Sequence, residues 1–233
     1  MRDSSSALTV VAAADAAEVA AVAGHALNNV LAHLFAASGY LEPPGAGADA
    51  TRARAAVDDA CRGGQALAAA LTLLGMTAAN LADVPHHAQQ LDATALARAL
   101  ESVAEVSGAE AHGVDSAGDG WATTLDADSI AAILICAAIT LRRAWGPALP
   151  LRCGVVTPTA ADGRLLLRVE AAADGSPVPP RRAGHGPCEL ALSHVAPLLP
   201  RLAAALEDRG PAGIDLALHP RSAAPEPFDE ATR

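Results

Sequence analysis

The chain has 233 residues and a formal net charge of −10, and 52% of its residues are hydrophobic while only 2% are aromatic. This apolar content, mostly alanine, leucine and valine, is enough for one large or two small domains, and it favours helices packed through small side chains. All the basic residues are arginines scattered between acidic residues, which argues against a nucleic-acid partner.

The sequence contains four cysteines: Cys61, Cys136, Cys153 and Cys188. They form no CxxC pair and have no histidines at zinc-ligand spacing, so neither a disulfide framework nor a metal site is predicted. A reducing cytoplasm is therefore the expected location. Asp15 and Glu18 interrupt the first apolar stretch, and we expect no signal peptide and no membrane contact.

The first helical pattern follows Asp15 and extends to about residue 42. It carries leucines at helical spacing: Leu27, Leu31, Leu34 and Leu41. His25 lies two residues before Leu27, about 200° round a helix, so it faces out if the leucines are buried. Asn29 follows His25 by four residues and stands beside it.

The segment "EPPGAGADA" ends this helix, and a second helical pattern covers residues 51–81. The two segments predict an antiparallel hairpin over residues 15–82. A single hairpin cannot bury an apolar stripe on each of its helices, whereas two hairpins share one core. We therefore expect a homodimer held together by a four-helix bundle.

Residues 91–220 predict a mixed α/β domain. Helical patterns cover residues 93–107, 127–144 and 188–209, and strand patterns occur in "LPLRCGVVTPT", "RLLLRVEAAA" and "GIDLALHP". Residues 1–14 and 221–233 are expected to be flexible ends. The predicted fold class is α+β.

The stretch "HALNNVL", which begins at His25, resembles the H-box of two-component histidine kinases. The hairpin that contains it is similar to their dimerisation and histidine-phosphotransfer domain, and the following order of helices and strands is similar to their ATP-binding domain. The resemblance thus implies a bundle-forming hairpin followed by a kinase-ATPase-like α/β sandwich.

Two departures concern the residues that activate histidine and hold magnesium in such kinases. The acidic residue that follows the kinase histidine is replaced by Ala26, so the general base is missing. The helix expected to carry a magnesium-binding asparagine has none, and Cys136 or Thr140 lies near that position.

The nucleotide-binding boxes are also eroded. Ala171 and Ala173 stand where the family has the aspartate and first glycine of its adenine-binding motif. Only Gly184 and Gly186 remain of the last glycine box, and we expect them to form a turn and not a phosphate site. A histidine-bearing hairpin joined to a degenerate ATP-binding domain resembles the bacterial histidine phosphotransferases of the ChpT type.

This resemblance implies a phosphorelay protein that passes a phosphoryl group between receiver-domain aspartates and has no autonomous kinase activity. His25 would be the phosphoacceptor, and Asn29 would orient the phosphoryl group or a water molecule. Asn28, Ala32 and Ala36 would contact the receiver. The implied partners are response-regulator receiver domains and a hybrid histidine kinase. No cofactor is expected in this chain, because the receiver supplies the magnesium ion.

Two alternatives remain open at this stage. One is a divergent sensor histidine kinase with an unusual ATP site, which would bind ATP. The other is a pseudokinase scaffold that binds receivers without chemistry. The remaining histidines have no comparable sequence context: His33, His86, His87, His112, His185, His194 and His219.

Overall fold

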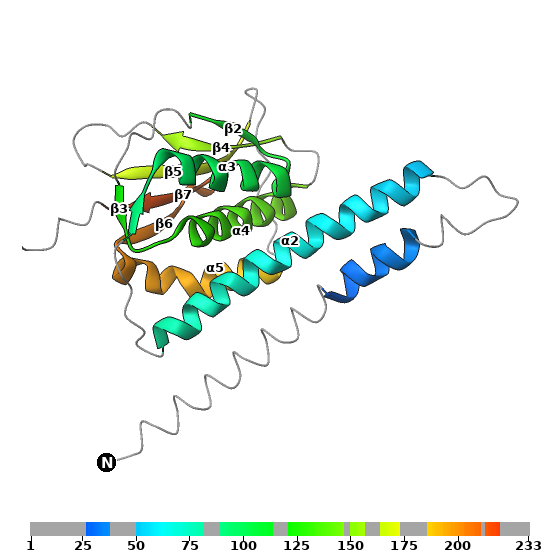
Figure 1. Ribbon diagram of the computed structural model, residues 1–233, viewed down its shortest axis with the longest axis horizontal. Helices are drawn as coiled ribbons and strands as arrows, with labels where there is room; N and C mark the ends of the chain where they lie inside the picture. Colours follow the sequence, from blue (N-terminus) through cyan, green and yellow to red (C-terminus); the bar gives the residue numbers. More distant parts are fainter. Residues whose placement is uncertain are drawn as a thin grey trace, which may run out of the picture.

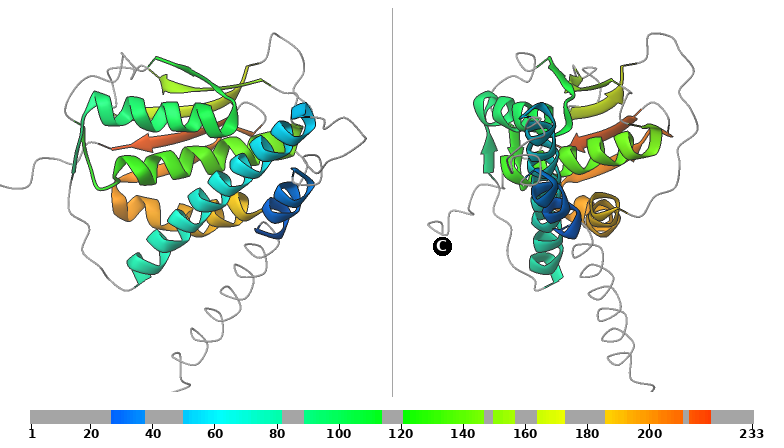
Figure 2. Two further views of the ribbon diagram at one scale, coloured as in Figure 1. Left: turned by 45° about the vertical axis from the view of Figure 1, so that its right-hand side comes forward. Right: turned by 90° about the vertical axis from the view of Figure 1, so that its right-hand side faces the viewer.

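The computed structural model describes residues 27–37, 50–81, 89–113, 121–146, 150–156, 164–172, 186–210 and 213–219. Residues 27–37 are helical, and α2 (Ala50–Leu81) runs beside them in the opposite direction (Figures 1 and 2). The two helices approach closely at Gly63, where an added Cβ would lie 3.1 Å from Cγ2 of Val30. These helices are the described part of the expected hairpin.

A mixed five-stranded sheet forms the second half of the chain. Its strands, in spatial order, are β2 (Glu110–His112), β4 (Leu151–Val156), β5 (Leu165–Ala171), β7 (Gly213–Leu218) and β6 (Ala204–Asp208). β2 pairs with β4 in parallel, and the other neighbours are antiparallel. A separate antiparallel pair joins β1 (Gln89–Leu91) to β3 (Trp121–Thr123).

Helices α3 (Ala93–Ser107) and α4 (Ala127–Trp145) cover one face of the sheet (Figure 1). Helix α5 (Pro187–Val195) continues into the 3₁₀ helix η2 (Ala196–Leu202), and both α5 and α2 pack against α4. Helix α4 is therefore central, and each of its residues from Ser129 to Ala138 is buried. This arrangement confirms the α+β prediction.

Side-chain caps set the starts of the two helices that cover the sheet. Asp92 accepts a hydrogen bond from the backbone N–H of Ala95, and Asp126 accepts one from Ser129, each at 2.6 Å. An aspartate at this position satisfies one of the free donors of the first helical turn and stabilises the helix by about 1 kcal/mol. The helices predicted to start at residues 93 and 127 do start there, because these aspartates cap them.

The helix expected over residues 188–209 is wrong in its last third. α5 and η2 end at Leu202, Ala203 adopts a left-handed φ of 51°, and β6 follows. Pro200 lies inside η2 and removes a backbone donor, which disfavours a continuing α-helix. β6 exists because it pairs with β7 along its whole length, an interaction that local helix propensity does not report.

Strands β1, β2 and β3 have three residues each and were not predicted, because so short a segment shows no clear period. The predicted strands over β4, β5 and β7 are confirmed. Among the described residues, no helix combines the length and apolar character that crossing a membrane requires.

Candidate functional site

The expected site lies at the start of the first helix. His25 itself lies outside the described residues, so its surroundings are not part of the structure. The other four predicted site residues are described and all are exposed on the helix over residues 27–37: Asn28, Asn29, Ala32 and Ala36. The structure therefore leaves the predicted docking residues accessible in the single chain.

The contact with α2 explains why this face is free. Val30 packs against Gly63, and Ala37 is only 3% exposed, so these positions form the side of the helix that α2 covers. At about 100° per residue, Asn29, Ala32 and Ala36 fall within an arc of about 60° on a different side. A partner could reach this arc without displacing α2.

His33 is a second histidine on the same helix. It is exposed and follows Asn29 by four residues, so the two side chains are neighbours on the helix surface. No H-box pattern surrounds His33, so sequence reasoning did not single it out. Its position makes it the natural control for any experiment on His25.

The leucine stripe is not buried within the single chain. Leu27, Leu31 and Leu34 are 49%, 40% and 43% exposed, and the neighbouring Phe35 is 73% exposed. The sequence argument placed His25 opposite a buried stripe, but Val30 and Ala37 make the contact with α2 instead. The stripe forms an apolar surface beside the side that contacts α2, roughly opposite the arc of Asn29, Ala32 and Ala36.

The positions that would carry a magnesium-binding asparagine are sealed in the core. Cys136 on α4 is fully buried and Thr140 is 5% exposed. A hydrogen bond to the Cys188 thiol, together with burial, raises the pKa of the Cys136 thiol well above its ordinary value. A buried neutral thiol in this position cannot act as a ligand for a hydrated magnesium ion.

The glycine that precedes α5 contacts Arg143 of α4. Gly186 is the N-cap residue of α5, with an extended backbone at φ −102°, and the rest of the turn expected around Gly184 and Gly186 lies outside the described residues. The guanidinium of Arg143 lies directly against it, and a Cβ at this position would collide with that group. Because Arg143 is exposed and its guanidinium is the flexible end of the side chain, the guanidinium could move aside to accept a larger residue at this position. Ala171 ends β5, and Ala173 and Gly184 lie outside the described residues.

Helix α2 is tied to the domain beside this glycine. The Cys188 thiol donates a hydrogen bond to the Ala66 carbonyl, with 3.6 Å between Sγ and O. Arg142 at the end of α4 donates from Nη2 to the Gly108 carbonyl at 2.9 Å. Burial, and secondarily the nearby Arg62 of α2, lower the pKa of Arg142.

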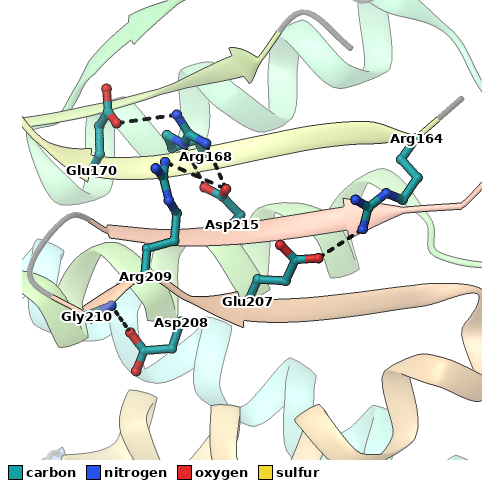
Figure 3. Close-up of polar contacts among 8 residues, drawn as sticks. All are labelled: Arg164, Arg168, Glu170, Glu207, Asp208, Arg209, Gly210 and Asp215. Atoms are coloured by element: carbon teal, nitrogen blue, oxygen red, sulfur yellow. Dashed lines mark hydrogen bonds and ion pairs between the residues drawn. The ribbon is translucent and has the colours of Figure 1, made fainter. Parts of the chain in front are cut away.

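A cluster of ion pairs occupies the sheet face opposite α3 and α4 (Figure 3). Arg168 on β5 binds both carboxylate oxygens of Asp215 on β7, at 2.7 Å and 2.8 Å. Arg209 Nη1 lies 3.9 Å from the same carboxylate, and Arg168 Nη1 lies 3.8 Å from Glu170. The hydrogen bonds to Asp215 are the main reason that the pKa of Arg168 is raised.

This cluster is structural in its geometry. The Asp215 side chain is 4% exposed and both its oxygens are engaged by Arg168, so it is not available as a general base. Sequence reasoning missed it, although alternation along β5 places Arg168 on the face away from the core. The sequence does not predict the pairing register of β5 and β7, which places Arg168 opposite Asp215.

A shallow groove of about 230 Å³ lies between α2, α3 and α4. Its polar side chains are Gln65, Thr72, Ser102 and Asp128, over a floor that includes Ala131 and Ala132. It holds neither histidine nor cysteine. Among the described residues, no group of three histidine, cysteine, aspartate or glutamate side chains could hold a metal ion.

Comparisons with known proteins give likenesses to solved structures alone. No family model matches the chain, and no curated protein matches it. Among solved structures, the Acinetobacter baumannii histidine kinase AdeS is similar over 84% of this chain and 96% of that chain, with a TM-score of 0.44 and 12% identity. A likeness at this level carries no argument about function, and the functional case depends on the residues themselves.

Proposed function

We propose that this chain is a histidine phosphotransferase of a two-component phosphorelay, which carries a phosphoryl group between receiver-domain aspartates on His25. The observation that carries the proposal is the exposed face formed by Asn28, Asn29, Ala32 and Ala36, which directly follows His25 in "HALNNVL". The small side chains of Ala32 and Ala36 would let a partner helix approach closely. The amides of Asn28 and Asn29 follow His25 by three and four residues, so they could contact a phosphoryl group bound to its ring.

The chemistry requires little from this chain beyond positioning. A ring nitrogen of neutral His25 would attack the phosphorus of an aspartyl phosphate in a receiver. The bond from phosphorus to the aspartate oxygen breaks as the new nitrogen–phosphorus bond forms, and the carboxylate leaves with the electron pair. The imidazole then releases a proton. The second receiver takes the phosphoryl group by the reverse sequence, and magnesium remains in the receiver.

Autophosphorylation from ATP is not part of the proposal. Ala26 cannot orient the imidazole or accept its proton, and the asparagine-equivalent positions Cys136 and Thr140 are buried. Arg143 packs against Gly186 at the start of α5, where the kinase resemblance expects a nucleotide phosphate. These features support a relay protein over an ATP-dependent kinase.

The proposed assembly is a homodimer with a four-helix bundle. Leu27 and Leu34 are spaced seven residues apart on the first helix, and Val57 and Leu71 are spaced fourteen apart on α2, where they are 38% and 50% exposed. Heptad spacing is typical of a seam between helices. A second copy of the hairpin presents the same stripes, so two copies can cover each other's apolar surface.

The decisive experiment is transfer from a phosphorylated receiver to the purified chain, followed by detection of acid-labile phosphate. Wild type and His33→Ala should become labelled and His25→Ala should not. His25→Ala should change stability by only about 0.5 kcal/mol, because an exposed helical position contributes little to the core. Phosphate on His25→Ala would refute the assignment of His25.

The outcomes also separate the alternative functions. A chain that binds receivers but never accepts phosphate from any donor tested would be a scaffold. Micromolar ATP affinity in the presence of magnesium, measured by calorimetry, would favour the divergent kinase. Asn29→Ala should give a milder defect than His25→Ala, since an amide orients a phosphoryl group but does not carry it.

A further inference from the structure

The C-terminal half of α2 belongs to the same hydrophobic core as the α/β domain. Ala66, Ala69, Ala70 and Leu73 are all buried, and Leu73 is fully so. They form one continuous cluster with buried residues of α3, α4, α5 and the inner face of the sheet. The views in Figures 1 and 2 show α2 crossing directly over α4 and α5.

The small side chains on α2 bring the helix backbones close together. Three of the four buried positions are alanine, so the facing helices are separated by little side-chain volume. Close packing of this kind resists sliding and rotation, because any displacement opens voids or produces overlap. The contact surface therefore favours one arrangement of α2 on the domain.

Two sulfur contacts link three helices at the same place. Cys188 on α5 donates to the Ala66 carbonyl on α2, and its thiol lies beside that of Cys136 on α4. Both cysteines are at most 2% exposed. The bond from Cys188 to Ala66 would be broken if α2 moved away from α5.

We infer that α2 and the α/β domain are one rigid body, with the orientation of the domain fixed on the hairpin. This goes beyond the proposed function and holds or fails whether or not His25 carries phosphate. A domain that delivers a phosphoryl group from bound nucleotide to a hairpin histidine must be able to change its position on the hairpin. Here the hydrophobic core shared by α2 and the domain prevents that movement.

The first test measures distances in the full chain. Cys61 on α2 is exposed while the other three cysteines are buried, so a thiol-reactive spin label should attach selectively to Cys61. A second label is introduced by Ser193→Cys at an exposed position of α5. With labelled chain diluted into unlabelled chain, the intrachain distance distribution should have one narrow peak. A broad distribution or two peaks would overturn the inference.

The second test uses hydrogen exchange with a matched pair of variants. Leu73→Ala removes a fully buried side chain, and Leu71→Ala, two residues away, removes one that is 50% exposed. In a single rigid body, Leu73→Ala should accelerate exchange in α2 and α4 together, by about tenfold or more, and Leu71→Ala should leave α4 unchanged. Faster exchange in α2 alone after Leu73→Ala would show two separate bodies.

Discussion

The exposed leucine stripe gives a quantitative test of the proposed homodimer. Leu71 is 50% exposed in the single chain, so Leu71→Ala removes atoms that are half in contact with water. Because the other half of the side chain is already buried, this substitution should cost the isolated chain up to about 1 kcal/mol, offset in part by the high helix propensity of alanine. A change in the dissociation constant of the dimer can then arise only from the interface.

The size of that effect follows from the exposed fraction. Full burial of a leucine side chain contributes about 1.5–3 kcal/mol, so burial of the remaining half in the dimer contributes about 1 kcal/mol. The residue occurs twice across a symmetric interface, so the dimer loses about 2 kcal/mol of binding free energy. The dissociation constant should then be about 30 times larger. Leu71→Glu should be more severe, because each copy would place an unpaired charge in the seam.

Sedimentation equilibrium over a range of concentrations measures these constants. Gln65→Glu is the matched control, since Gln65 is exposed on the same helix but lies about 120° round it from Leu71. It should dimerise like the wild type. A wild-type chain that is monomeric at micromolar concentration, or a Leu71→Glu variant with an unchanged dimer, would show that the stripe is not the interface.

Three further outcomes are expected. Arg168→Met should lower the free energy of unfolding in urea by about 3 kcal/mol, because the buried Asp215 carboxylate loses its main cationic partner. Arg164→Met should cost less than about 1 kcal/mol, because its partner Glu207 is exposed. Equal losses in the two variants would contradict this account. Burial raises the pKa of Cys153 from 9.0 to about 11, so the unfolded chain releases this proton first. Cys153 should contribute a loss of roughly 2–3 kcal/mol between about pH 9 and pH 11, in addition to the loss from the buried Cys136, and Cys153→Ala should remove the share of Cys153 in pH-dependent denaturation. Calorimetry with ATP and magnesium should detect no micromolar binding, and autophosphorylation should be undetectable.

The sequence by itself determined the elements that have strong local signals. The helices that became α3 and α4 start at aspartate caps and carry long apolar patterns, so residues 93 and 127 could be predicted as their first positions. The strands β4, β5 and β7 carry enough apolar residues to be recognised without their neighbours. The H-box pattern and the exposure of the residues after it were equally available from the sequence.

Tertiary structure decided which apolar surfaces are covered. The leucine pattern on the first helix predicts a buried stripe, but Val30 and Ala37 meet α2 and the leucines remain exposed in the single chain. On α2, the conspicuous Leu71 faces out while the alanines at 66 and 70 enter the core. Periodicity identifies an apolar face, but it does not identify the partner that covers it.

The same limit applies to β6, to the Arg168–Asp215 pair and to Gly186. Each depends on a neighbour far away in sequence: β6 on β7, Arg168 on the pairing register, and Gly186 on the side chain of Arg143. Local propensity acts over a few residues, whereas strand register, ion pairing and close backbone approach are set only when distant segments pack together.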